Sequence, residues 1–303
     1  MAATTEGATG AELTRFEEFA LRVGKLTNEV PTMKVMQGRF LRWISFSWVR
    51  ASLIRRTFVE GLQAVAELHP DRGVLLGSNH RSFFDQYAML LSMYVGGASW
   101  AKRLYFPVRS NFFYEKPLGM LVNYAVGGGV MYPPVFRQAE RSKQNKETLD
   151  KLVRFLAEPG TVVGVHPEGT RGKGPDPYEM LPAQPGIGQM ALVGKPIVIP
   201  AFVNGLSNDI VKDIRANFKH GIRHERPCII VFGEPLDYSE YLAQKPRPAL
   251  YKKTADLFRA RILELGERER ELRRQCLAGE IADDHPGWLA NQQKSSLFAR
   301  IDD

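Results

Sequence analysis

Short apolar runs alternate with stretches of helical periodicity along most of the chain. Four of these runs are predicted to be buried strands, since they are rich in apolar and β-branched side chains and are bounded by turn residues. They are Val74–Leu76, Thr161–Val165, Pro196–Val203 and Cys228–Phe232. The helical stretches include Phe83–Val95 and Tyr251–Leu277. Strands separated by helices predict an α/β fold with a mixed central sheet flanked by helices.

The N-terminal segment has a different pattern. Residues 11–30 are predicted to form a short helix that Pro31 ends, and Met33–Val59 carries six basic side chains and no acidic one. One apolar face of helical spacing contains Met33, Met36, Phe40, Ile44 and Trp48. Such a segment either lies in the interface of an anionic bilayer or packs on the core with a solvated basic edge. The pattern leaves both interpretations open.

The composition does not change within residues 57–278. We therefore expect three parts: an N-terminal helical attachment to a membrane surface at 1–56, one domain at 57–278, and a polar C-terminal tail at 279–303.

The 303 residues include 41 Lys and Arg against 33 Asp and Glu, a net charge of +8. This charge favours an anionic partner, such as a membrane surface, a phosphorylated substrate or a nucleic acid. No nucleic-acid recognition motif is present, so no nucleic-acid partner is expected. The two cysteines, Cys228 and Cys276, exclude a disulfide scaffold and a cysteine-rich zinc module. No run of about 18 apolar residues and no secretory signal pattern occurs, which predicts a peripheral protein on the cytoplasmic face of a membrane.

The first candidate site lies between the strand at residues 74–76 and the helix that follows it. In open α/β sheets, ligands bind just beyond the carboxyl ends of strands, where His80 is expected. If His80 is in the turn and Asp85 in the first turn of the helix, their side chains can meet. A carboxylate on one imidazole nitrogen fixes the tautomer and leaves the other nitrogen free as a base. A structural histidine beside a helix-start aspartate is the simpler alternative.

The second candidate site is Val165–Gly174, which also follows a predicted strand. Its glycines allow close approach of the backbone. Arg171 offers a planar fork of donors suited to phosphate, and Lys173 adds a point charge. Glu168 suits an anion site only if it positions Arg171 or a hydroxyl group. An ordinary glycine turn with solvated charges is the alternative.

Together these segments resemble the glycerolipid acyltransferase family, of the lysophosphatidic acid or glycerol-3-phosphate acyltransferase type. Asn79–Asp85 is similar to the Asn-His-x-Ser-x-x-Asp pattern of that family, and Pro167–Arg171 to its Pro-Glu-Gly-Thr-Arg block. A third segment, Gly194–Pro200, is similar to the family's Pro-Ile-Val-Pro block with one inserted isoleucine. The matches follow the family's order and span residues 57–235, which implies a glycerol-phosphate-acyltransferase-like fold with 57–278 as the acyltransferase domain.

The resemblance implies that a fatty acyl group moves from an acyl-CoA or acyl carrier protein thioester to a hydroxyl of lysophosphatidic acid. His80 would be the general base and Asp85 would hold its tautomer. No cofactor beyond the thioester co-substrate and no metal is expected. The implied acceptor-binding residues are Glu168, Gly169, Thr170 and Arg171, with Arg137 and Arg109 as candidates from the family's second block.

Two departures from the family pattern leave alternatives open. His166 stands where the family usually has Phe, and Pro133–Phe136 replaces the usual approach to the final arginine of the second block. These oddities are compatible with another acceptor: a different lysolipid, a glycolipid or glycerol phosphate. An inactive lipid-binding protein at the membrane surface is an alternative of another class. A metal hydrolase using His80, Asp85, His166 and Glu168 matches no zinc signature that we can name.

The resemblance also implies a place for the acyl chains. Candidates to line an acyl tunnel, each of which ordinary core packing would explain equally well, are Phe112, Phe113, Tyr114, Tyr87, Met89 and Met93.

Overall fold

A mixed sheet forms the centre of the molecule. The computed structural model describes residues 13–292, and within them six strands pair in the order β1-β8-β7-β2-β6-β3. All neighbours are parallel except β7 and β8, which are antiparallel. The predicted fold class is therefore confirmed. The strands are β1 (Thr57–Glu60), β2 (Val74–Ser78), β3 (Arg103–Tyr105), β6 (Thr161–Val165), β7 (Ile197–Asn204) and β8 (Cys228–Phe232), with β4 (Val108–Arg109) and β5 (Pro134–Val135) forming a separate pair.

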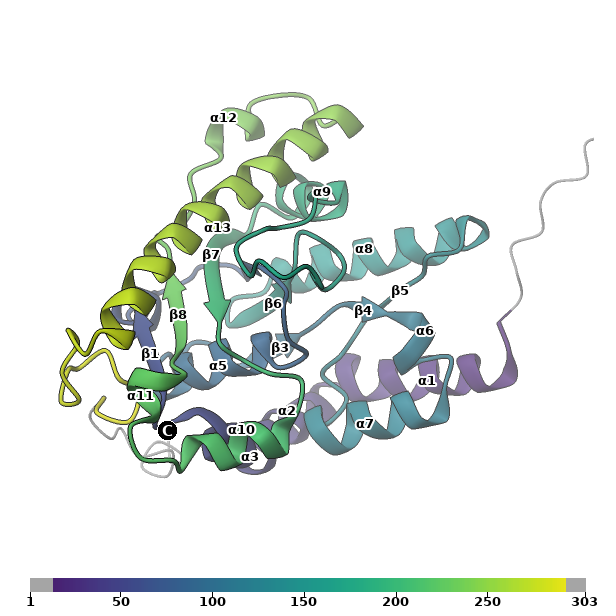
Figure 1. The fold of residues 1–303 in the computed structure, drawn as a ribbon. Helices are drawn as coiled ribbons and strands as arrows, with labels where there is room; N and C mark the ends of the chain where they lie inside the picture. Colours follow the sequence, from purple (N-terminus) through teal and green to yellow (C-terminus); the bar gives the residue numbers. More distant parts are fainter. Residues whose placement is uncertain (1–12, 293–303) are drawn as a thin grey trace, which may run out of the picture.

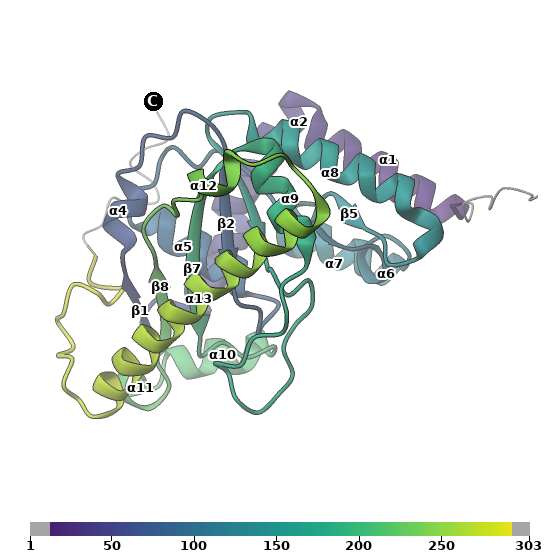
Figure 2. The ribbon, with the colours of Figure 1, turned by 90° about the horizontal axis from the view of Figure 1, so that it is seen from above.

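Helices cover both faces of the sheet (Figures 1 and 2). Three helices, α8 (Ser142–Leu156), α9 (Pro185–Gly194) and α13 (Pro248–Leu277), pack on one face, and α3 (Phe46–Leu53) and α5 (Asp85–Val95) pack on the other. The side chains of successive residues in β2 point to opposite faces of the sheet. Leu75 joins the core with the first group, and Val74 and Leu76 join the core with the second, as the period of a strand requires.

The remaining helical segments are shorter or lie at the ends of the sheet. They are α1 (Arg15–Glu29), α2 (Pro31–Phe40), the π-helical turn η1 (Leu41–Ser45), α4 (Leu62–Ala66), α6 (Ser110–Phe113), α7 (Pro117–Gly127), the 3-10 turn η2 (Ala139–Arg141), α10 (Ile210–Asn217), α11 (Ile222–Glu225) and α12 (Ser239–Leu242). Within residues 13–292, none of the helices is long and apolar enough to cross a membrane.

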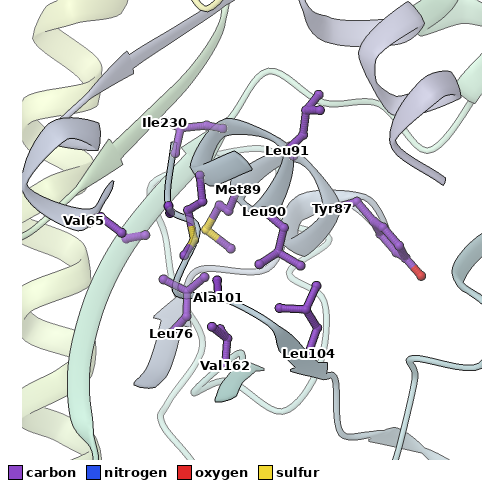
Figure 3. Close-up of a cluster of buried hydrophobic side chains, with 14 of the residues drawn as sticks. Val65, Leu76, Tyr87, Met89, Leu90, Leu91, Ala101, Leu104, Val162 and Ile230 are labelled. Carbon is purple, nitrogen blue, oxygen red and sulfur yellow. The ribbon is translucent and has the colours of Figure 1, made fainter. Parts of the chain in front are cut away.

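The helix α5 packs its buried side chains against the sheet. Figure 3 shows Met89 and Leu90 beside Leu76 and Val162, with Tyr87 of the same cluster at the right. These side chains are almost completely excluded from solvent. Tyr87 and Met89, and also Met93 on the same helix, therefore pack in the core of this structure, which is the alternative to an acyl tunnel that the sequence left open.

The basic N-terminal segment is not one continuous helix. It divides into α2, η1 and α3, and its last residues form β1, because Thr57–Glu60 pairs with β8. Core packing is the interpretation that the structure supports for one part of this segment, and the membrane interpretation of the exposed part stays a prediction. Leu41, Phe46 and Val49 are buried in the core with the sheet, whereas Met36 and Ile44 from the predicted apolar face are more than half exposed.

A buried amine joins the N-terminal helices to the sheet. Lys34 donates three hydrogen bonds, to Asn28 Oδ1 (3.0 Å), Gln37 Oε1 (2.7 Å) and the carbonyl of Leu104 in β3 (2.5 Å). Burial lowers the pKa of this amine well below its usual value. The three acceptors account for all three protons, so Lys34 has a structural role.

The C-terminal segment also differs from the expected polar tail. Trp288 is fully buried against Phe58 of β1, with 5.2 Å between ring centroids, and Ile281 belongs to the same cluster. Backbone bonds join Val59 to Gly287 and Leu289 to Thr57. The expectation is thus corrected for residues 281–292, which cover the edge of the sheet. Residues 1–12 and 293–303 lie outside the described residues.

We predict that Trp288→Ala lowers the free energy of unfolding by about 3–5 kcal/mol, since it leaves a cavity against Phe58. Urea denaturation measures this loss. Leu277→Ala, at a half-exposed position near the same end of the chain, is the control and should cost less than about 1 kcal/mol. Equal small losses in both variants would show that residues 281–292 do not contribute to the fold.

Candidate active site

The turn that follows β2 is fixed to the neighbouring strand by a buried asparagine. The side chain of Asn79 donates to the carbonyl of Val203 and accepts from its amide, both at 2.8 Å. Val203 lies in β7, the parallel neighbour of β2. The turn therefore starts from a defined position at the carboxyl ends of two strands, where ligand sites of open α/β sheets form.

His80 and Asp85 meet across this turn as expected. The Nδ1 atom of His80 lies 3.1 Å from Oδ2 of Asp85. The same oxygen accepts from the backbone amides of Arg81 and Ser82, at 2.8 Å each. Asp85 is the first residue of α5 and fully buried. This contact assigns the proton of the neutral imidazole to Nδ1 and leaves Nε2 free to accept one.

Burial shifts the pKa values of both groups. Burial, together with the positive charges of Arg171 and Arg109, lowers the pKa of His80 to about 4. Burial raises the pKa of Asp85 to about 6, although His166, the backbone amides of Ser82 and Arg81, and Arg171 each lower it in part. At neutral pH the imidazole is thus uncharged and the carboxylate ionised. These are the two states that a general base and its orienting partner need.

Glu168 supports the backbone of His80. It is almost completely buried, and its two carboxylate oxygens accept from the amides of His80 (2.9 Å) and Leu181 (2.8 Å). The carboxylate therefore joins the β6–α9 loop to the turn after β2. These contacts support a positioning role for Glu168, and its predicted contact with the acceptor stays a prediction.

Arg171 is held over the site by a residue outside the motifs. Its Nη1 donates to Oδ1 of Asn208 (2.7 Å), and its guanidinium lies 4.1 Å from the centre of the Phe83 ring. Asn208 also accepts from the backbone amide of Phe83 at 3.0 Å. The sequence analysis missed Asn208, although it follows β7 at the same end of the sheet as His80. Since both partners are neutral, Arg171 keeps its positive charge available to an anion.

The loop that carries Asn208 is itself anchored. The adjacent Ser207 accepts a hydrogen bond from Ser82 Oγ at its carbonyl (2.7 Å) and donates from its own amide and hydroxyl to Asp213. Asp213 forms a fully buried ion pair with Arg56 at 2.8 Å. Removing one member of such a pair leaves an uncompensated buried charge, so this loop has little freedom to move.

The other predicted binding residues lie around the same loop. Arg109 donates two hydrogen bonds to the carbonyl of Gly169, at 2.9 and 2.5 Å. Gly169 has φ +61°, a conformation that favours glycine. Thr170 follows it and is half-buried, while Arg137 is exposed and close enough for its charge to lower the pKa of Arg109. The structure thus brings Arg109 and Arg171 to His80 and places Arg137 beside Arg109.

His166 stacks on His80. The two rings are 3.8 Å apart and nearly parallel, at 6°. The Nδ1 atom of His166 lies 2.8 Å from the carbonyl oxygen of Asn79 and 3.1 Å from that of Ser78, which assigns its proton to Nδ1. Burial lowers its pKa to about 3, so this ring is also neutral. His166 therefore supports one face of the His80 ring without competing for its proton.

This stacking does not suit a shared metal ion, although ligand atoms of His80, Asp85 and His166 lie within 4.8 Å of one another. A metal lies close to the plane of each imidazole that binds it, and the planes of two stacked rings, with centroids 3.8 Å apart and an interplanar angle of 6°, do not meet at one ion. The Nδ1 atom of His166 is also engaged by backbone carbonyls. The observed arrangement therefore favours acid–base chemistry over the metal-hydrolase alternative.

Comparison with protein families gives the reaction class. Residues 56–204 match the family model described as Acyltransferase. Residues 56–204 form an acyltransferase domain of the glycerolipid acyltransferase family. The matched range contains the His80–Asp85 pair and the Arg171 loop and ends just before Asn208. Among curated proteins, none matches the chain. Acyl transfer is therefore the general activity of this domain, and the pair at the end of β2 lies inside it.

The pKa shifts predict how the acyltransferase activity depends on pH. As the pH falls through about 6, the His80–Asp85 pair binds a proton and loses the carboxylate that orients Nδ1. We expect kcat/KM to be constant between about pH 7 and 8 and to fall below about pH 6. A pH profile of wild type and Asp85→Asn tests this. The slower variant should lack the fall near pH 6, and a fall that persists in it would contradict the assignment.

Variants of His166 test the stacked ring. His166→Ala removes the ring that supports His80, and we expect kcat to fall by about 10- to 100-fold with little change in the acceptor KM. His166→Phe keeps an aromatic face and should recover most of kcat. Steady-state kinetics with thermal unfolding as a folding control measures both. Equal activity losses in the two variants would show that the hydrogen bonds of His166, rather than its ring face, are what His80 requires.

Proposed function

We propose that the protein is an O-acyltransferase that moves a fatty acyl group from acyl-CoA or an acyl carrier protein thioester to the hydroxyl of lysophosphatidic acid. The observation that carries this proposal is the neutral His80, oriented by Asp85, with the guanidinium groups of Arg109 and Arg171 close by. An alcohol is a poor nucleophile until a base removes its proton, and a positioned base accelerates such a step by about 10²–10⁴-fold.

The acyl group passes directly from the thioester to the acceptor hydroxyl, without a covalent acyl-enzyme intermediate. The Nε2 atom of His80 accepts the proton of the acceptor hydroxyl while its oxygen attacks the thioester carbonyl. Asp85 stabilises the imidazolium that forms. The carbon–sulfur bond then breaks, an oxygen ester remains on the acceptor, and the departing thiolate receives the proton from His80. No side-chain nucleophile and no external redox partner is needed.

Arg171 and Arg109 support an acceptor that carries a phosphate. Neither forms an ion pair within residues 13–292, since their hydrogen-bond acceptors are the amide oxygen of Asn208 and the carbonyl of Gly169. A phosphate would gain a planar fork of donors from each guanidinium. Orientation of the acceptor hydroxyl toward His80 then contributes several kcal/mol to the rate, on the order of the range known for well-aligned reactants.

Another acceptor remains the principal alternative, because His166 and Pro133–Phe136 depart from the family pattern. It would be another lysolipid, a glycolipid or glycerol phosphate. We further propose that the reaction takes place at an anionic membrane surface, to which the N-terminal helices attach. The basic segment 31–59, which has no acidic residue, supports this location.

The test is transfer of a labelled acyl group from acyl-CoA, and in parallel from an acyl carrier protein, to a panel of acceptors. The panel contains lysophosphatidic acid, glycerol phosphate, a neutral lysolipid and a lyso-glycolipid. We expect transfer to lysophosphatidic acid, lowered by about 10²–10⁴-fold in His80→Ala. Transfer to another acceptor alone would keep the base and change the substrate. No transfer to any acceptor would favour the lipid-binding alternative.

The Arg171→Ala variant tests whether this arginine binds the phosphate of the acceptor. We expect it to raise KM for the phosphate-bearing acceptor by about tenfold or more and to leave use of a neutral acceptor unchanged. Asn208→Ala should act in the same direction with a smaller effect, because it loosens Arg171 without removing its charge. An Arg171→Ala variant with an unchanged phosphate KM would show that the acceptor binds elsewhere.

A further inference from the structure

The helix α7 presents an apolar face to solvent. Its sequence, from Pro117 to Gly127, contains no charged residue. Leu118 and Leu121 are 63% and 64% exposed, the highest values among the exposed large hydrophobic side chains of residues 13–292. Surface helices of water-exposed proteins normally turn polar side chains outward. An outward face of leucines therefore indicates a surface that is covered when the protein works.

Two neighbouring segments are joined directly to α7. Thr27 of α1 forms a hydrogen bond with Tyr124 at 3.1 Å, and Ser45 of η1 donates to the carbonyl of Val126 at 2.5 Å. Figures 1 and 2 show α1, α2 and α7 together at one end of the molecule. These helices come from distant parts of the sequence, so the fold assembles this region from N-terminal and central segments.

The neighbours also expose large apolar side chains. Together with the two leucines of α7, they supply nine of the seventeen that are exposed within residues 13–292. We call these nine the lipid-facing set: Phe19, Leu26, Val30, Val35, Met36, Trp43, Ile44, Leu118 and Leu121.

The charged residues around the lipid-facing set distinguish between two partners that could cover it, a second copy of the chain and a bilayer. The same segments carry Arg22, Lys25, Arg39 and Arg42, and residues 31–59 contain no acidic side chain. On α1, Glu17 and Glu29 are paired with Arg141 and Lys151, and Glu18 is the acidic side chain of this helix that is exposed. A second copy docked through this face would bring two basic rims together, which repel. An anionic bilayer offers acyl chains for the apolar centre and phosphate for the rim.

The path of the chain connects α7 to the site. Arg109, which bonds Gly169 of the site loop, is followed at once by α6 and then by α7. An acceptor with its phosphate at Arg109 would therefore have its acyl chain near the start of α7. Insertion of α7 would set the depth at which the site meets lipid headgroups.

We propose that α7 inserts into an anionic bilayer as part of one surface with α1, α2 and η1. The sequence analysis placed membrane contact only in the N-terminal segment, so this assigns a membrane role to an element of the acyltransferase domain itself. The inference rests on the proposed membrane location but not on the acceptor or the acyl donor.

Binding to vesicles without any acyl donor tests the inference separately from catalysis. The probes are vesicles of phosphatidylcholine with and without phosphatidylglycerol, and binding is measured by co-sedimentation. The full chain should bind the anionic vesicles more tightly. The double variant Leu118→Glu with Leu121→Glu should lose about tenfold or more in affinity, because two apolar side chains no longer enter the bilayer. Leu277→Glu, a single change of the same kind at an exposed leucine of α13, should bind like wild type.

Further readouts separate the outcomes. Circular dichroism and thermal unfolding confirm that the variants fold. Brominated lipids should quench fluorescence of the full chain, and Trp43→Phe should lose most of that quenching.

Wild-type affinity in the α7 double variant would overturn the inference, as would equal binding to neutral vesicles. A concentration-dependent dimer that the double variant abolishes, without vesicle binding, would assign the face to a second copy. Failure of acyl transfer alone would leave the vesicle result standing and would count against the proposed function.

Discussion

The backbone of the turn after β2 is the constraint on which the site depends. Asn79 ties it to β7, Glu168 ties the amide of His80 to the β6–α9 loop, and Asp85 accepts the next two amides. These hydrogen bonds are buried or partly buried, where a polar contact is strong and costly to leave unmade. The imidazole of His80 is thus placed by its own backbone as well as by Asp85. A base fixed in this way needs little reorganisation when the acceptor arrives.

Burial has two opposing effects on this base. It keeps His80 neutral at working pH, but a lowered pKa also makes the ring a weaker proton acceptor. Asp85 resolves the conflict, because its negative charge stabilises the imidazolium only as the proton moves. His166 adds a neutral face on the other side and introduces no competing charge. The arrangement therefore depends on Asp85 remaining ionised, which makes its raised pKa the more sensitive of the two shifts.

The parts that were predictable from sequence are those encoded locally. Alternation of strands and helices gave the fold class, and the five-residue step from His80 to Asp85 gave the pair, because a strand, a turn and a helix start lie within one short segment. The buried role of Glu168, the stack of His166 and the support of Arg171 by Asn208 join residues that are far apart in the chain. Such contacts depend on the order of the strands in the sheet, and they produce no periodic pattern in the sequence. The buried position of Trp288 was missed for the same reason, since its partner Phe58 is far from it in the sequence.

The choice of partners for the arginines links the site to its surroundings. A carboxylate beside Arg171 or Arg109 would compensate the charge and weaken attraction for a phosphate. The fold instead gives Arg171 an amide oxygen and a ring face, and gives Arg109 a backbone carbonyl. These neutral contacts fix the direction of each guanidinium while the net charge stays available. Acidic side chains that do lie nearby are buried and engaged, as Glu168 and Asp85 are. The positive potential at His80 therefore depends on the pairing of charges within the fold: the nearby carboxylates are engaged, and the two guanidinium groups are not neutralised. The basic composition of the chain alone would not have produced this potential.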